Sequence, residues 1–91
     1  MKIEWTNKAM SDLMRLYEFL APMNKLAAAR VVRLLAEAPK RLLDQPRIGE
    51  QLEEFKPRDV RRIVVERYEI RYVIQNANIY VLRLWQTRED R

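Results

Sequence analysis

Apolar residues recur at helical spacing over the first quarter of the chain. A stripe with separations of four, three and four positions is formed by Ala9, Leu13, Leu16 and Leu20. Thr6 is suited to cap the start of such a helix, and Pro22 disfavours helical geometry in the residue before it. The pattern therefore predicts a helix that begins after Thr6 and ends by residue 21. The preceding stretch "KIEW" alternates apolar and polar residues and predicts a short strand.

A second helical stripe follows directly. Asn24 can cap this helix, and its buried side is predicted to contain Ala28, Val31, Val32, Leu35 and Ala38. Pro39 breaks or kinks the helix, and the segment "DQPRIG" ends regular structure. The alanine-rich start "LAAARVV" allows close approach of the two helices, so we expect an antiparallel helical hairpin.

The pattern changes to a period of two after a polar connection at residues 45–59, which we expect Ile48, Leu52 and Phe55 to anchor to the core. Residues 60–86 contain three runs rich in β-branched and aromatic residues, separated by "ERYE" and "QNAN". In the last run, Tyr80, Leu82 and Leu84 alternate with Ile79, Val81, Arg83 and Trp85. Neither side of this strand is plainly polar, which predicts a central strand.

These elements predict one α+β domain spanning residues 1–91. The expected architecture is an N-terminal strand and an α-helical hairpin packed on a three-stranded antiparallel meander. With 91 residues, the chain can bury one modest core.

Charge adds a first indication of function. The formal net charge is +5, which favours an anionic partner such as nucleic acid, an anionic membrane surface or an acidic protein. Residues 57–91 contain no lysine but many arginines, namely Arg58, Arg61, Arg62, Arg67, Arg71, Arg83, Arg88 and Arg91. Guanidinium groups pair bidentately with carboxylates and phosphates, so this region has the composition of a binding surface. The alternative is a set of solvated side chains on exposed strands.

The residue types that are missing narrow the chemistry. The sequence has no cysteine and no histidine, which excludes disulfides, thiolate chemistry and the residue best suited to proton transfer near neutral pH. Only one glycine is present, so a phosphate-cradling loop is not expected, and we predict no cofactor. Glu50, Glu53 and Glu54 are interpreted as a solvated acidic run, so no metal is predicted. No apolar segment is long enough to span a bilayer, and we expect a cytoplasmic protein.

Two stretches resemble a known group of proteins. The segments "LLDQPRIGEQL" and "VRRIVVERYEIRYVIQNANIYVLRLWQTRED" are similar to the RelE/ParE superfamily of bacterial type II toxins, most of all to its ParE branch. The resemblance covers nearly the whole chain and lies in the order and spacing of degenerate motifs. It implies a toxin held inactive by a cognate antitoxin, either ParD-like or another small protein, in a hetero-oligomer.

The superfamily contains two mechanisms. RelE-like members are ribosome-dependent ribonucleases that cut messenger RNA, whereas ParE-like members inhibit DNA gyrase. Glu69 stands where the nucleases tend to carry arginine, and the ending "WQTREDR" lacks histidine and tyrosine. A carboxylate would repel the scissile phosphate, and no residue of this ending readily exchanges a proton at neutral pH. We therefore predict no catalytic residue and a toxin that binds gyrase. Two alternatives stay open: a ribonuclease that uses Tyr68, Tyr72 or Lys56, and a decayed toxin that only binds antitoxin.

The resemblance also suggests two interaction sites. The predicted target-binding residues, at the open end of the last strand, are Arg83, Trp85, Gln86 and Arg88. Arg83 can equally hold the chain end through Glu89 or Asp90. An amphipathic or acidic antitoxin segment is expected across the hairpin and the sheet edge, with the predicted contacts Leu13, Tyr17, Ala28, Val32, Leu35 and Val81.

Overall fold

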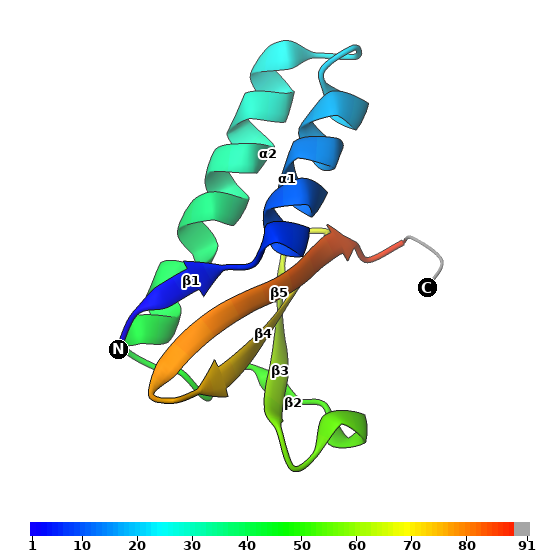
Figure 1. Cartoon of the computed structure of the whole chain (residues 1–91). Coiled ribbons are helices and arrows are strands. Elements are labelled where there is room, and N and C mark those ends of the chain that lie inside the picture. Colours follow the sequence, from blue (N-terminus) through cyan, green and yellow to red (C-terminus); the bar gives the residue numbers. More distant parts are fainter. Residues whose placement is uncertain (89–91) are drawn as a thin grey trace.

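A computed structural model describes residues 1–88 of the chain. Two long helices follow a short first strand, and the second half of the chain forms most of a sheet (Figure 1). The elements are β1 (Ile3–Trp5), α1 (Asn7–Leu20), α2 (Lys25–Glu37), the 3-10 helix η1 (Ala38–Leu43), β2 (Glu50–Gln51), the 3-10 helix η2 (Glu53–Phe55), β3 (Asp59–Val65), β4 (Tyr68–Gln75) and β5 (Asn78–Gln86).

Both helix starts are capped by the residues that the sequence predicts. The Thr6 hydroxyl accepts a hydrogen bond from the Ala9 amide at 3.1 Å, and the Asn24 side chain accepts one from the Ala27 amide at 3.0 Å. Helix α1 ends at Leu20, as expected before a proline. At Pro39 the chain continues as the 3-10 helix η1, so this proline tightens the helical path instead of ending it.

The sheet has five strands in the order β1-β5-β4-β3-β2. Strands β3, β4 and β5 form the predicted antiparallel meander, and β5 lies inside the sheet as expected. The two further strands were not part of the predicted sheet: β1 pairs in parallel with β5, and β2 pairs with β3. Strand β2 has only two residues within a polar segment, so no alternation marks it.

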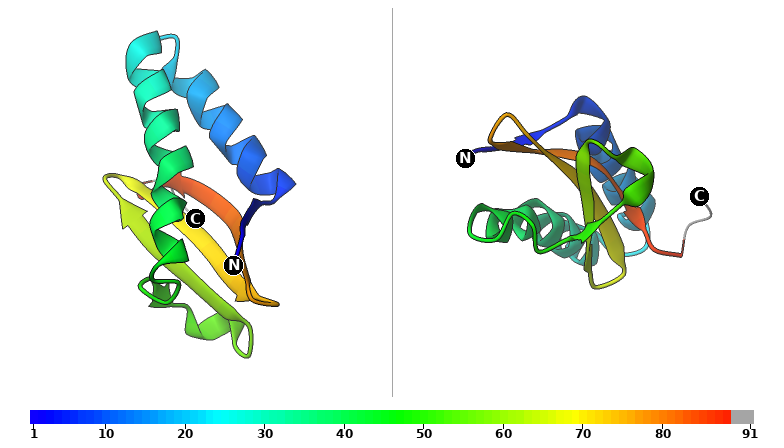
Figure 2. Two further views of the ribbon diagram at one scale, coloured as in Figure 1. Left: turned by 90° about the vertical axis from the view of Figure 1, so that its left-hand side faces the viewer. Right: turned by 90° about the horizontal axis from the view of Figure 1, so that it is seen from below.

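The hydrophobic core lies between the helical hairpin and one face of the sheet, and the opposite face is left uncovered by helices (Figure 2). Fully buried core side chains come from both layers, among them Ala9, Leu35, Leu42, Ile70, Tyr72, Ile79 and Val81. The loop end of the hairpin projects past the sheet. Leu52 and Phe55 are half-buried, but Phe55 contacts Arg71 and not the core cluster. The expected anchoring of Ile48 is wrong, because 53% of its surface is exposed.

Strand β5 contains a bulge that the alternating pattern does not predict. Arg71 pairs with Arg83 and the next residue, Tyr72, pairs with Val81, so Leu82 has no partner on β4. The extra residue brings both Val81 and Leu84 to the core side, where they are 0% and 2% exposed. The predicted grouping of Leu84 with Tyr80 on one face, opposite Val81, is therefore wrong.

Candidate functional site

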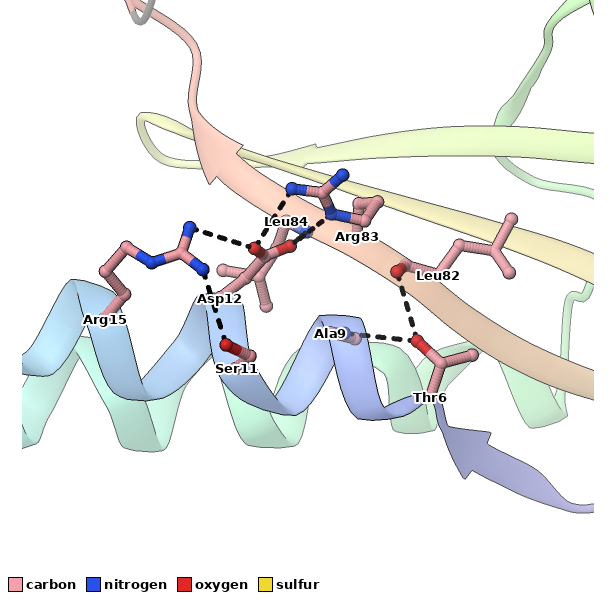
Figure 3. Close-up of polar contacts among 8 residues, drawn as sticks. All are labelled: Thr6, Ala9, Ser11, Asp12, Arg15, Leu82, Arg83 and Leu84. Carbon is pink, nitrogen blue, oxygen red and sulfur yellow. Dashed lines mark hydrogen bonds and ion pairs between the residues drawn. The ribbon is translucent and has the colours of Figure 1, made fainter.

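The bulge in β5 is held by polar groups of helix α1 and its cap. The Thr6 hydroxyl donates to the Leu82 carbonyl at 3.1 Å, and the Leu84 amide donates to the Asp12 carboxylate at 3.0 Å (Figure 3). The same carboxylate accepts from Arg83, through Nε at 2.8 Å and through Nη2 at 3.2 Å. The bulge thus turns Arg83 toward α1 and gives it a bidentate partner.

Asp12 is a functional-site residue that the sequence did not indicate. Its side chain is only 5% exposed, whereas the Arg83 side chain is 43% exposed. The carboxylate raises the pKa of the Arg83 guanidinium, so this group stays charged. The available signal was a charged residue three positions after Ala9, on the inward side of an otherwise apolar helical stripe. Arg83 therefore has a partner on α1; the suggested partners Glu89 and Asp90 lie outside the described residues.

A cavity of about 260 Å³ opens beside this ion pair, between α1 and the end of β5. It is lined by Asp12, Arg15, Leu16, Phe19, Arg83, Leu84, Trp85 and Gln86. Three of the predicted target-binding residues, Arg83, Trp85 and Gln86, therefore meet at one concave surface. Arg88 is exposed after the strand end and does not line the cavity. Phe19 adds an aromatic ring that is 64% exposed and that the sequence did not indicate as functional.

The uncovered face of the sheet carries a charged cluster. Arg62 on β3 lies opposite Arg71 on β4, and Glu69 lies between their guanidinium groups. The Glu69 carboxylate is 3.1 Å from Arg62 Nη1 and 3.6 Å from Arg71 Nη2, and its side chain is 1% exposed. Arg62 Nε also donates to Glu50 at 2.8 Å. The hydrogen bonds from Arg62 to Glu50 and Glu69 raise the pKa of this guanidinium, so the cluster pairs two cations with two carboxylates.

Two aromatic rings contact the Arg71 guanidinium group. The Arg71 guanidinium carbon lies 4.8 Å from the ring centre of Trp85 and 5.3 Å from that of Phe55. Both distances are typical of cation–π contacts. Trp85 therefore joins the two parts of the site, because it stacks on Arg71 and also lines the cavity.

Both tyrosines considered for acid–base chemistry, Tyr68 and Tyr72, face the core. Tyr68 is 6% exposed, and Tyr72 is fully buried with its hydroxyl donating to the Pro46 carbonyl at 2.7 Å. Burial raises the pKa of Tyr72, so this phenol keeps its proton at neutral pH and supplies no phenolate to act as a base. The third residue considered, Lys56, is held by Glu53 at 2.9 Å. Neither tyrosine is placed beside the arginines of the uncovered face.

A second, almost wholly apolar groove of about 280 Å³ lies between the helices. Its lining residues are Leu13, Met14, Tyr17, Glu18 and Val32, so it unites three of the predicted antitoxin contacts. The remaining three, Ala28, Leu35 and Val81, are 0% exposed in the core. These three have no accessible surface in the toxin alone. Helical periodicity marks the buried side of a helix and gives no measure of what stays accessible.

The described part of the chain shows neither a metal site nor a membrane span. Among residues 1–88, no group of three or more carboxylates is placed to hold a metal ion. No helix in this part of the chain is long and apolar enough to cross a membrane.

Comparison with known proteins shows the fold through a solved structure and the family through a family model. A solved structure described as a chromosomal ParDE toxin–antitoxin system from P. aeruginosa matches with a TM-score of 0.80. The match covers 97% of this chain and 97% of that chain at 23% sequence identity, and it establishes the α+β fold of this toxin class. Residues 3–91 match the family model of the ParE toxin of the type II toxin–antitoxin system, parDE. The chain therefore belongs to the ParE toxin family. No curated protein matches it.

Proposed function

We propose that this ParE-type toxin acts by binding DNA gyrase through the cavity between α1 and β5, and that it cuts no nucleic acid. Gyrase as the target is taken from the resemblance to the ParE branch. The cavity is chosen because it combines the residue types that dominate protein interfaces, namely an exposed phenylalanine, a tryptophan and two arginines, Arg15 and Arg83.

The observation that carries the non-enzymatic mechanism is the state of the arginines on the uncovered face. Cleavage through a ribose 2′-hydroxyl needs a base for that proton and free cations for the phosphate. Arg62 is bonded to two carboxylates, and Arg71 lies in contact with two aromatic rings beside Glu69. Tyr68 and Tyr72, the tyrosines proposed as substitute bases, are buried on the other side of the sheet. These contacts support a binding role over the ribonuclease alternative.

Gyrase assays on the purified chain test this proposal. With the wild type we expect inhibited supercoiling or accumulated cleaved DNA. Phe19→Ala should lose potency by about tenfold or more, because the complex would bury this aromatic side chain as an interface anchor. Leu26→Ala is the matched control, because Leu26 is 84% exposed and lies outside the cavity. Full supercoiling at high toxin excess would remove gyrase as the target. Equal potency of Phe19→Ala and wild type would show that gyrase does not bind at this cavity.

The ribonuclease alternative has its own direct test. Tyr80 is the tyrosine whose strand position faces away from the core, opposite Val73 on β4. The wild type and the variants Tyr68→Phe, Tyr72→Phe, Lys56→Gln and Tyr80→Phe are incubated with translating ribosomes, and the message is mapped by primer extension. Breaks that appear with the wild type and vanish with any one of these variants would contradict the non-enzymatic mechanism.

We further propose that the antitoxin occupies the apolar groove between α1 and α2. Met14 is 63% exposed at this groove and Tyr17 is 36% exposed, so an amphipathic segment can bury both. Met14→Glu should abolish copurification with the cognate antitoxin. Leu43→Glu, at a residue 46% exposed on η1, should not. Retained copurification of Met14→Glu would exclude this groove, and unimpaired growth on expression of the wild-type toxin alone would favour the decayed-toxin alternative.

A further inference from the structure

The charged cluster on the uncovered face is built like a phosphate site that is already filled. Arg62 and Arg71 are directly opposed on neighbouring strands, a pairing that is unfavourable for like charges without a counter-ion. Each oxygen of Glu69 faces one of them: Oε1 lies 3.1 Å from Arg62 Nη1, and Oε2 lies 3.6 Å from Arg71 Nη2. A phosphate that bridged two guanidinium groups would use its oxygens in the same way.

The neighbouring rings extend this likeness. Phe55 and Trp85 both lie against the Arg71 guanidinium, and both side chains are partly accessible. Aromatic rings beside arginines form the platforms on which proteins stack the bases of single-stranded nucleic acid. The composition of this face therefore suits a single strand, apart from the carboxylate at its centre.

We propose that Glu69 is a specificity-determining residue that closes this face to single-stranded nucleic acid. Its charge occupies the place between Arg62 and Arg71 that a backbone phosphate needs, and it repels any phosphate that approaches them. The side chain is 1% exposed and lies beneath the arginines, so it is a fixed counter-ion. This inference does not rest on gyrase binding, and its test reads nucleic-acid affinity alone.

The test compares the wild type with Glu69→Gln by fluorescence anisotropy of a labelled oligouridylate at several salt concentrations. The amide keeps the size of the side chain but removes its charge. We expect affinity to rise by about tenfold or more, because the carboxylate between the two guanidinium groups no longer repels a phosphate. The slope of the logarithm of the binding constant against the logarithm of the salt concentration should steepen by the amount expected for about one to two additional phosphate contacts. A purely structural role of Glu69 predicts a lower melting temperature with unchanged affinity and slope.

Controls separate this effect from a general change in charge. Glu50→Gln also removes a carboxylate from Arg62, but at a side chain that is 63% exposed, so its effect should stay below about threefold. Adding Arg71→Gln to Glu69→Gln should cancel the gain. Equal affinity of wild type and folded Glu69→Gln, or an equal gain with Glu50→Gln, would overturn the proposal.

A further variant keeps the proposal testable if Glu69→Gln fails to fold. With Glu69 in place, Arg62 and Arg71 should contribute little to oligouridylate binding. The single variant Arg62→Gln, which leaves Arg71 beside Glu69, should therefore lose no more affinity than Arg33→Gln, which removes an exposed charge from α2. A clearly larger loss of affinity would show that the arginines of this face already contact nucleic acid in the wild type. It would refute the proposal that Glu69 prevents such binding.

Discussion

The ion pair between Asp12 and Arg83 allows a quantitative prediction, and it bears on every test of the strand-end site. Replacing Arg83 with alanine leaves the Asp12 carboxylate, 5% exposed, without its bidentate partner. Removing one partner of a buried ion pair costs about 3–5 kcal/mol. Arg83 itself is 43% exposed, and the Leu84 amide still donates to Asp12, so the loss should be smaller. We expect Arg83→Ala to lower the free energy of unfolding by about 2–3 kcal/mol.

A double-mutant cycle isolates the pair. Asp12→Ala should cost about 3 kcal/mol, because it leaves the buried Leu84 amide without its acceptor and Arg83 without its anion. The double variant should cost little more than either single change, which gives a coupling energy of about 2 kcal/mol. Urea unfolding followed by far-UV circular dichroism measures each value. Arg15→Ala is the control: its contact with Asp12 is 3.6 Å long at a side chain 69% exposed, so its effect should stay within about 0.5 kcal/mol.

The outcome decides how the strand end can be tested for target binding. If Arg83→Ala unfolds within about 0.5 kcal/mol of the wild type, or the coupling is that small, the stabilising role assigned to the pair is refuted. If the predicted losses are found, reduced toxicity of Arg83→Ala reports a weakened fold as well as a lost contact. Phe19 and Gln86 are then the cleaner positions for substitution, since neither is part of this ion pair.

The remaining predictions concern turns and the buried tyrosine. Ala77 has a φ of 60° in the β4–β5 turn, a conformation that glycine adopts freely, so Ala77→Gly should raise the free energy of unfolding by about 0.5–1 kcal/mol in urea titration. Gly49→Ala should lower it by about 1–3 kcal/mol and lower the melting temperature, because the added Cβ would lie 2.6 Å from the Tyr72 hydroxyl and 2.7 Å from the Arg62 carbonyl; an unchanged melting temperature would contradict this packing. Tyr72→Phe should cost about 1–3 kcal/mol at neutral pH, since the Pro46 carbonyl and the Gly49 amide lose their partner. Burial raises the pKa of Tyr72, so the unfolded chain releases this proton first, and wild-type stability falls as pH rises above about 10. The stability difference between wild type and Tyr72→Phe should therefore narrow above that pH, and a constant difference would refute the assigned burial effect.

The sequence predicted the local features well because single residues report them. Thr6 and Asn24 cap the helices as expected, and the meander follows the runs of β-branched residues. Pairing between distant segments was not accessible in this way. Nothing in "KIEW" says that β1 lies parallel to β5, and nothing in the alternation of the last run marks the bulge at Leu82.

The candidate site was predicted in part for the same reason. Arg83, Trp85 and Gln86 could be selected by residue type and by position near the strand end. Asp12, 71 positions away from Arg83 in the chain, becomes part of the site only when the bulge turns the arginine toward α1. Ala28 and Leu35 were assigned to a surface because a helical stripe does not distinguish a groove from a core.

Helix α1 lines the strand-end cavity and the interhelical groove with opposite sides. Positions 12, 15, 16 and 19 face the cavity, while positions 13, 14, 17 and 18 face the groove. Under the proposed assignments, helix α1 contacts gyrase with one side and the antitoxin with the other. Changes along its groove side can then re-pair the toxin with a different antitoxin while its action on the cell is preserved. Related systems in one genome can diverge in this way without neutralising one another's toxins.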